Sequence, residues 1–439
     1  MRYALLLMFL CFTLQAQIPQ WANDAVIYEV NIRQYTPEGT FNAFSEHLPR
    51  LQEMGVEIIW LMPIHPIGEE KRKGSLGSYY SVKDYKGINP EFGNLSDFKN
   101  LVNKAHALEM KVIIDWVANH TAWNHPWTKE HPEWYTKGPD WNFVPPVADW
   151  SDVIDLNYDR KPLWSEMIES MKYWLVEADI DGFRCDVAEM VPTYFWEKAK
   201  VELDKVKPVF MLAEAENPEH HEAAFNMSYG WEFHHIMNDI AKGEKNAAAV
   251  TDYFARKFQR FGADNLQMFF VTNHDENSWN GSEFERMGDG VQAFAALTFC
   301  LPNMPLIYSG QEAAMTKRLA FFEKDSIDWA GYPMQDFYAR LVNMKKENTP
   351  LYNGEFGGDL EFLDVGNKNI CAFIRTLDRE KVLCIFNFSN EEQKFKMNFE
   401  YLPKQFVNVY MPNDKGKYKL KSLKKLAAWR FYILKGVEK

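Results

Sequence analysis

GFRCD, at residues 182–186, is a short, mostly apolar run that ends in a carboxylate. Two later segments have the same form: VFMLAE at residues 209–214 and FFVTNHD at residues 269–275. Short apolar runs are typical of strands that are buried on both faces, as in parallel sheets. A carboxylate at the C-terminal end of three successive strands of this kind predicts an active site at the mouth of a parallel barrel.

The carboxylates that end these segments are Asp186, Glu214 and Asp275. If they converge at a barrel mouth, they are suited to acid/base or nucleophilic catalysis. Arg184 precedes Asp186 by two positions, so their side chains point to the same face of a strand. A charge-assisted hydrogen bond from Arg184 would hold Asp186 ionised, and the alternative role for Arg184 is a purely structural ion pair.

Residues 26–340 alternate strand-like runs with amphipathic helical stretches, as expected of βα units around a parallel sheet. Helical spacing of apolar residues predicts helices over 41–54, 95–109 and 162–177, and Gly55 is suited to end the first of them. The predicted strands are 26–32, 57–62, 111–116, 182–185, 209–213, 229–233, 268–272 and 305–308, of which 229–233 is weak. Eight such units predict an α/β protein with a closed (β/α)8 TIM barrel.

Two regions do not follow the βα pattern. Residues 120–158 lack periodicity and are too long for an ordinary connection, so they predict a small inserted domain after the third strand. Its tryptophans are expected to form a small core, with some lining a cleft. From residue 350, short alternating segments rich in β formers predict an all-β sandwich domain over 350–439. The barrel itself is then assigned to residues 17–349.

Composition limits the partners of this chain. The 49 Lys and Arg residues and 61 Asp and Glu residues give a net charge of −12 without a long basic cluster. A nucleic-acid or anionic-membrane partner is therefore not expected.

Residues 1–16 contain a basic start, an apolar run too short to span a bilayer and a small residue, Ala16. They predict a cleaved signal peptide and hence a secreted or periplasmic protein, with an N-terminal anchor as the alternative. The cysteines beyond this segment lie in apolar runs and are expected to be small buried residues. A disulfide between Cys371 and Cys384 is the alternative in an exported protein.

DWVANH, at residues 115–120, closes the third predicted strand. Together with the three carboxylate segments, it resembles the four motif regions of glycoside hydrolase family 13, the α-amylase family, in their family order. Each motif alone is weak evidence for this family, whereas four motifs in this order are a specific sign of it. The resemblance implies that Asp186 is the nucleophile of a retaining glycosidase, Glu214 the general acid/base and Asp275 the carboxylate that stabilises the transition state. Unequal environments must then separate the pKa values of the first two.

The same resemblance implies residues that bind the sugar. His120 and His274 would donate hydrogen bonds to its hydroxyls, and Tyr80 would stack beneath the ring, with Tyr79 as the alternative. The substrate would be an α-glucan or maltooligosaccharide, and α-1,4 bonds are the bonds expected to be cleaved.

A metal site is also implied by the resemblance. Asn119 corresponds to a calcium ligand of the family, and the segment VIDLN at 153–157 resembles one that supplies an aspartate, here Asp155. Calcium requires six to eight oxygen ligands. A structural calcium ion is one interpretation, and hydrogen bonding by Asn119 alone is the other. The chemistry itself is not expected to need a cofactor.

The chain departs from its family just after the nucleophile. Starch-cleaving endo-amylases typically carry Lys-His where this chain has Glu189 and Met190. Linkage, chain length, endo or exo action and oligomeric state therefore stay open. Hydrolysis is the leading hypothesis, transglycosylation on the same barrel is the second, and a glucan-binding protein without activity is the third.

Overall fold

The computed structural model describes residues 18–262, 265–411, 413–414 and 416–437. The predicted signal peptide, residues 1–16, lies outside the described residues. Within them, no helix combines the length and the apolar character that a membrane crossing requires.

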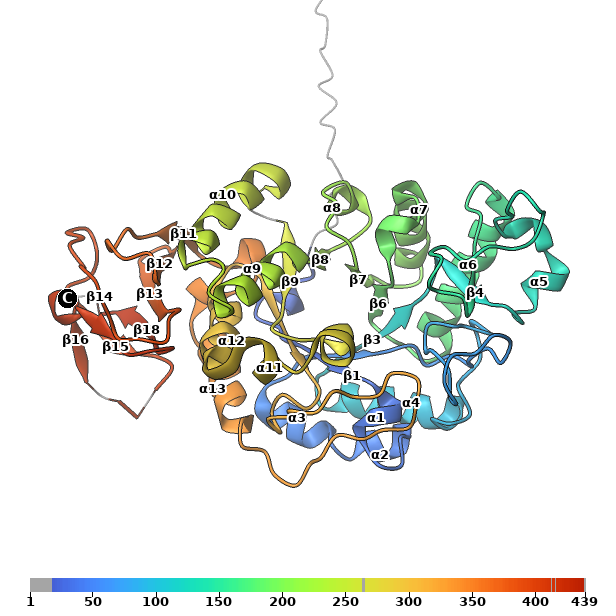
Figure 1. Ribbon diagram of the computed structural model, residues 1–439, viewed down its shortest axis with the longest axis horizontal. Helices are drawn as coiled ribbons and strands as arrows, with labels where there is room; N and C mark the ends of the chain where they lie inside the picture. Colours follow the sequence, from blue (N-terminus) through green and yellow to red (C-terminus); the bar gives the residue numbers. More distant parts are fainter. Residues whose placement is uncertain (1–17, 263–264, 412, 415, 438–439) are drawn as a thin grey trace, which may run out of the picture.

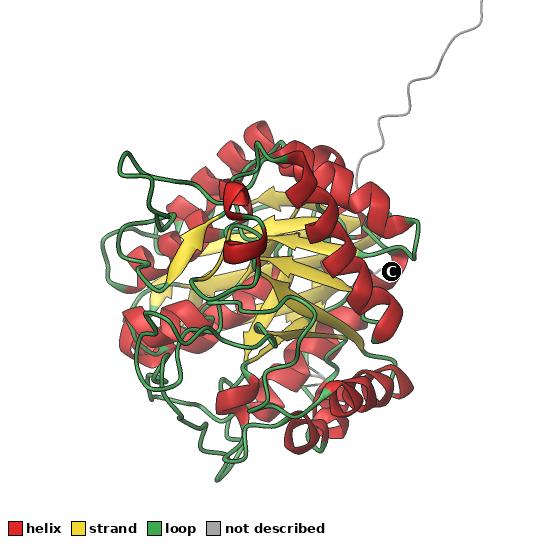
Figure 2. Cartoon of the chain, turned by 90° about the vertical axis from the view of Figure 1, so that its right-hand side faces the viewer, coloured by secondary structure: helices red, strands yellow, loops and turns green. Residues whose placement is uncertain are grey.

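Eight parallel strands close into a barrel at the centre of the protein, in the order β1-β10-β9-β8-β7-β6-β3-β2. Figure 2 shows these strands surrounded by helices. The strands are β1 (Ile27–Val30), β2 (Ile58–Leu61), β3 (Lys111–Trp116), β6 (Gly182–Cys185), β7 (Phe210–Ala213), β8 (Met227–Tyr229), β9 (Leu266–Phe269) and β10 (Met304–Tyr308). The predicted (β/α)8 barrel is confirmed.

Side chains of the barrel strands divide between two cores. Ile27, Ile58, Ile113 and Phe210 belong to one apolar cluster that fills part of the barrel. Alternate residues, such as Tyr28 and Ile59, belong to the larger cluster beneath the helices. Both faces of these strands are thus buried, which explains why the sequences of the strands are continuous apolar runs.

The helices are α1 (Ile32–Tyr35), α2 (Phe41–Ser45), α3 (Leu48–Met54), α4 (Leu95–Ala107), α5 (Trp127–Glu130), α6 (Lys161–Glu177), α7 (Thr193–Asp204), α8 (His220–Ala223), α9 (Trp231–Ala241), α10 (Ala248–Phe261), α11 (Glu283–Met287), α12 (Val291–Cys300) and α13 (Gln335–Lys346). Asn94 begins α4 with a capping box that includes Asp97. Gly55 ends α3 with φ of 93°, as expected of a C-terminal glycine.

Several predicted boundaries were wrong. The single helix predicted over 41–54 is two helices, because the chain turns at Glu46 and His47 before Pro49 enters the first turn of α3. The weak sixth strand lies at Met227–Tyr229 rather than 229–233, because Trp231 already begins α9. β9 ends at Phe269, so an irregular stretch, and not the strand itself, carries the chain to Asp275.

The segment after β3 contains a two-stranded antiparallel sheet of β4 (His120–Ala122) and β5 (Val153–Asp155). In this pairing His120 lies opposite Asp155. Trp127 and Trp134 are buried and their rings pack edge to face, whereas Trp141 is 80% exposed. The two buried tryptophans belong to the same large apolar cluster as the helices around the barrel, so the expectation that these tryptophans form a small core of their own was wrong.

The C-terminal region is built from β strands, as predicted, with short 3-10 helices at Gly354–Phe356 and Leu420–Ser422 (Figure 1). A six-stranded sheet has the order β11-β12-β13-β18-β15-β16, and β14 pairs with β17 in a small second sheet. Apolar residues of both sheets share one core. The strands are β11 (Asp359–Phe362), β12 (Ile370–Leu377), β13 (Glu380–Asn387), β14 (Gln393–Lys394), β15 (Gln405–Asn408), β16 (Lys417–Lys419), β17 (Lys425–Leu426) and β18 (Phe431–Gly436).

The four described cysteines are buried and free. Cys371 lies opposite Phe386 and Cys384 opposite Phe373, so the two are offset by two positions across the hairpin of β12 and β13. The alternative of a Cys371–Cys384 disulfide was therefore wrong for this structure, and the expectation of small buried side chains holds.

Gly182, the first residue of β6, gives a test of the barrel packing. A Cβ atom there would lie 1.9 Å from the Phe210 carbonyl oxygen on β7. We expect Gly182→Ala to destabilise the protein by at least about 1–3 kcal/mol, because the two backbones must separate. Thermal unfolding would show a lower midpoint. Gly331→Ala is the control, because a Cβ at Gly331 meets no atom within 4 Å; equal midpoints for both variants would contradict the expectation.

Candidate active site

A cavity of ≈ 470 Å³ opens at the C-terminal end of the barrel. Six of the predicted site residues line it: Tyr80, His120, Asp186, Glu214, His274 and Asp275. Arg184 lies below them, fully buried inside the barrel. The structure thus brings together side chains that the sequence distributes over almost two hundred residues.

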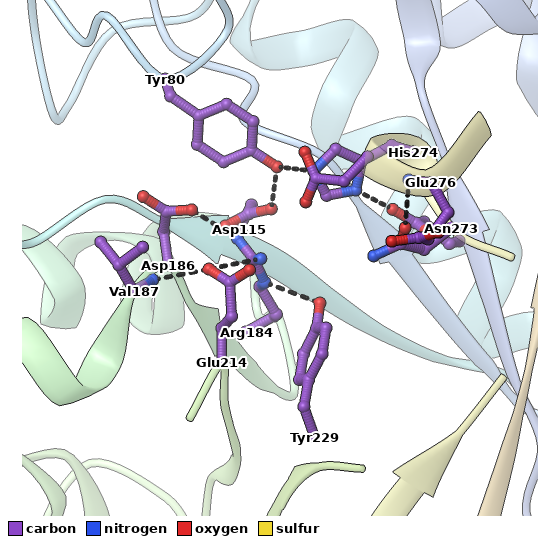
Figure 3. A network of polar contacts seen from close by, with 12 residues as sticks. Tyr80, Asp115, Arg184, Asp186, Val187, Glu214, Tyr229, Asn273, His274 and Glu276 are labelled. Carbon is purple, nitrogen blue, oxygen red and sulfur yellow. Dashed lines mark hydrogen bonds and ion pairs between the residues drawn. The ribbon is translucent and has the colours of Figure 1, made fainter. Parts of the chain in front are cut away.

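Arg184 is the centre of the polar network in Figure 3. Its Nη1 donates to Oδ1 of Asp115 at 2.8 Å and to Oδ1 of Asp186 at 2.9 Å. Its Nη2 lies 2.9 Å from Oε2 of Glu214. Nε donates to the Tyr229 hydroxyl at 3.1 Å. One guanidinium therefore faces three carboxylates at once, which confirms the predicted contact with Asp186 and adds two more.

Burial dominates the electrostatics of these carboxylates. It raises the pKa of Asp186 to about 6 and that of Glu214 to about 7, although the charge of Arg184 acts in the opposite direction on both. Burial likewise raises the pKa of Asp115 to about 6. Because the three groups interact, their titrations are coupled. Near neutral pH the network favours a proton on Glu214 before one on Asp186.

Val187 contributes a feature that the sequence did not reveal. Its φ of 38° and ψ of 47° place a β-branched residue in the left-handed region, where such residues are strained. This conformation accompanies a hydrogen bond in which the Val187 backbone N–H donates to Oε2 of Glu214 at 2.7 Å. The strained residue directly after Asp186 thus orients the carboxylate of Glu214.

His274 is held from two sides. Nδ1 contacts Oε1 of Glu29, a fully buried residue of β1, and Nε2 lies 2.7 Å from the Tyr80 hydroxyl. The Tyr80 hydroxyl in turn donates to Oδ2 of Asp115 at 3.1 Å, so it accepts from Nε2. Both ring nitrogens then carry protons. Burial alone would lower the pKa of His274, but Asp275 and Glu29 raise it to about 9.

Glu29 was not predicted from the sequence. The available signal was a single acidic residue inside the otherwise apolar strand Ile27–Val30, whose four residues are all buried. Such a residue requires a partner. Nothing in the local sequence indicates that this partner is His274, because 245 positions separate them.

Tyr80 is the tyrosine that lines the cavity. Its ring stacks on His274 at 5.6 Å and on Phe321 at 6.2 Å between centroids. Tyr79, the predicted alternative, is buried with the Arg33 guanidinium 4.3 Å from its ring centroid and does not line the cavity. Of the two tyrosines, Tyr80 is therefore the one that faces the cavity.

Asn119 and Asp155, the expected calcium ligands, do not form a metal site by themselves. They supply one amide and one carboxylate, far fewer ligands than calcium requires. Among the described residues, no group of three or more His, Cys, Asp or Glu side chains is arranged to hold a metal ion. Asn119 Nδ2 lies 3.2 Å from Nδ1 of His120, whose ring is neutral at pH 7 because burial lowers its pKa to about 4. The amide of Asn119 thus orients the His120 ring.

Aromatic and charged side chains from three loops complete the cavity wall. Trp150 comes from the segment after β3, Trp279 from a π-helix at Glu276–Asn280, and Phe321 and Phe322 from the segment after β10. Trp279 is 52% exposed. Exposed aromatic faces at a cavity are suited to stack on the apolar faces of sugars. From the sequence, such a role was predicted for the tryptophans of 120–158 only.

Comparison with known proteins identifies the chain. The family model for the α-amylase catalytic domain matches residues 20–152 and 147–350, and that for the C-terminal domain of maltogenic amylase matches residues 360–433. The chain belongs to the α-amylase family. This family membership accounts for the order of the four motifs and for the barrel followed by a β domain.

Relatives of this α-amylase family member include α-amylase 3 of Dictyoglomus thermophilum, 24% identical over 89% of both chains. α-Amylase MalA of Haloarcula japonica is 26% identical over 85% of this chain, which spans 56% of that relative's length. Among solved structures, an α-amylase from Lactobacillus plantarum has a TM-score of 0.85 and 29% identity, over 94% of this chain and 99% of its own. The maltogenic α-amylase AmyB of Thermotoga neapolitana has the same score and identity, over 95% and 99%.

The contact between Glu29 and His274 can be tested by titration. We expect Glu29→Gln to lower the pKa of His274 from about 9, because the imidazolium loses an anionic partner while its geometry is retained. NMR of histidine-labelled protein measures this directly. Glu276→Gln is the matched control, since Glu276 contacts His234 at 3.1 Å and not His274. An unchanged pKa of His274 in Glu29→Gln would contradict the assignment.

Proposed function

We propose that the protein is a retaining glycosidase that hydrolyses α-glucosidic bonds, with α-1,4 bonds of starch-type glucans or maltooligosaccharides as the expected substrates. The observation that carries the proposal is the placement of Asp186 and Glu214 on one buried guanidinium at the mouth of the barrel. The relatives named α-amylase support the substrate class.

In this proposal Asp186 is the nucleophile. Its carboxylate attacks the anomeric carbon while Glu214 gives its proton to the leaving oxygen, and a glycosyl ester forms on Asp186. Glu214 then takes a proton from water, which attacks the anomeric carbon and releases Asp186. Arg184 favours the ionised form of Asp186, and burial keeps a proton on Glu214 by raising its pKa. The higher pKa of Glu214 supports this order of the two roles.

Asp275 and His274 serve the sugar ring in the same proposal. Asp275 lines the cavity and is about one-third exposed, so it faces the space that the sugar would occupy. Its carboxylate is suited to hydroxyl groups and to the positive charge that develops on the ring. His120 would offer a hydrogen bond to another hydroxyl, as would His274 in exchange for its contact with Tyr80, and Tyr80 offers its ring face.

Replacement of the nucleophile tests this mechanism. We expect Asp186→Asn to lower kcat on maltooligosaccharides by on the order of 10⁴-fold or more, because an amide cannot form the glycosyl ester. Reducing-sugar assays measure the loss, and thermal unfolding checks the fold. Asp289→Asn, at an exposed position, is the control. A rate within a few-fold of the parent protein would refute the proposed role.

The pH profile provides a second test. Activity should rise as Asp186, with its pKa of about 6, loses its proton and fall as Glu214, with its pKa of about 7, loses its own. The optimum of kcat/KM is therefore expected between these values, on a bell-shaped curve. An optimum below about pH 4, where ordinary carboxyl groups titrate, would contradict the effect of burial.

Transglycosylation is the second candidate function. The relatives include α-1,4-glucan:maltose-1-phosphate maltosyltransferases of Picrophilus torridus and Salinibacter ruber, 27% and 28% identical. In transfer, a sugar hydroxyl replaces water in the second step. Chromatography of products at high maltooligosaccharide concentration distinguishes the two, since only transfer yields chains longer than the substrate.

Export is part of the proposal as well. The basic, apolar and small-residue pattern of residues 1–16 supports a signal peptide that directs the protein out of the cytoplasm. N-terminal sequencing of the mature protein would show a start after Ala16.

A further inference from the structure

The strand order shows on which side of the site each part of a substrate lies. Glu214 follows β7, and β7 is diametrically opposite β1 in the barrel order. A proton donor must face the leaving oxygen, so the leaving part of the sugar chain lies on the β7 side. The part that stays on the nucleophile extends the other way. In the barrel order that direction points to β1, which is flanked by β2 and β10.

The segments that follow β2 and β10 are bonded to each other. The Leu76 backbone N–H donates to the Phe322 carbonyl at 3.1 Å, and the Ser75 N–H donates to Oε1 of Glu323 at 2.9 Å. Gly74 has φ of 63°, and a Cβ there would lie 2.5 Å from the Phe322 Cβ. The two segments therefore touch at these residues, partly backbone to backbone.

The segment after β1 supports this contact from below. The guanidinium of Arg33, which is almost fully buried, donates to the carbonyls of Gly77 at 3.0 Å and Leu76 at 3.3 Å. Gln34 Nε2 donates to the Ala320 carbonyl at 2.6 Å, and Lys324 Nζ donates to the Arg33 carbonyl at 2.6 Å. In Figure 1 the orange segment after β10 passes beside the blue helix α1, which contains Arg33 and Gln34.

Lys73 extends the wall to the segment after β3. Its Nζ donates to the Asp149 carbonyl at 2.6 Å and lies 3.4 Å from Oδ1 of Asp152. Lys73 and Phe322 both line the cavity, so they face the substrate as parts of this wall. The wall is continuous from the segment after β3, through residues 73–77, to residues 320–324. We call it the glycone wall, after the glycone, which is the part of the sugar chain that stays on the nucleophile.

We propose that the glycone wall closes the end of the cavity that receives the non-reducing end of the sugar chain, so that the protein acts as an exo-enzyme. It would bind a chain by its free non-reducing end and release short sugars from it, with the rest of the chain leaving on the β7 side. This inference rests on the proposed function of Asp186 and Glu214.

A blocked substrate tests the inference. The probes are 4-nitrophenyl α-maltoheptaoside with a free non-reducing end and the same compound carrying a 4,6-O-benzylidene group at that end. We expect the blocked compound to be cleaved about 100-fold more slowly, because the added ring meets the wall. Chromatography should show one short sugar and a shortened aryl oligosaccharide as first products from the free compound.

The outcomes separate the two proposals. Equal rates on both compounds would overturn exo action while leaving the hydrolase assignment intact. Cleavage of neither compound, nor of starch, would refute the proposed function and the inference with it. Slow cleavage of the blocked compound, together with normal cleavage of the free compound, supports the proposal that the wall closes this end of the cavity.

A loop variant tests which contact closes the end. Glu323→Ala removes the acceptor for Ser75 at a partly exposed position that does not line the cavity. We expect the ratio of blocked to free cleavage to rise about 10-fold, because the two segments of the wall separate. Glu355→Ala, an exposed glutamate near the C-terminal sheet, is the control. An unchanged ratio in Glu323→Ala would overturn the assignment of this contact to the wall.

Discussion

The active site depends on one imbalance of charge, in which a single buried guanidinium faces three carboxylates. Arg184, Asp115, Asp186 and Glu214 are all largely withdrawn from water. A buried charge without a partner is unfavourable, and one cation cannot compensate three anions. The arrangement of lowest free energy keeps a proton on one carboxyl group near neutral pH. The protein thus obtains an ionised and a protonated carboxyl group side by side, which is the condition that retaining glycosidase chemistry requires.

Strand register creates this arrangement. Asp115 on β3 lies directly opposite Arg184 on β6, and Cys185 lies opposite Ala213 on β7. The residues that follow this last pair are Asp186 and Glu214, so they meet at the barrel mouth as neighbours. The Glu214 backbone N–H donates to the Cys185 carbonyl at 3.0 Å and continues the ladder. The positions of the reacting groups are therefore set by backbone hydrogen bonds, and not by mobile loops.

This origin in register explains what could be predicted from the sequence. Asp186 and Glu214 were predictable because each directly follows a short apolar run. Packing of the barrel does not require a carboxylate at such a position. Glu29, Val187 and Phe321 were not predictable, because their roles depend on partners far away in the chain or on a strained backbone. For a related reason, calcium binding could not be predicted from the sequence. The sequence indicates Asn119 and Asp155 as donors, but the number of oxygen atoms around a metal is a property of the folded chain alone.

Different parts of the structure determine the chemistry and the substrate preference. The carboxylates stand on strands, whereas the glycone wall consists of loop-to-loop hydrogen bonds such as those of Leu76 and Ser75. Each such bond contributes only about 1 kcal/mol net, so a few substitutions suffice to open or close the end of the cavity. Neither of these loop residues contacts Arg184. The length of the released sugar can therefore change without altering the pKa values that drive cleavage, which explains how one barrel accommodates different products with one mechanism.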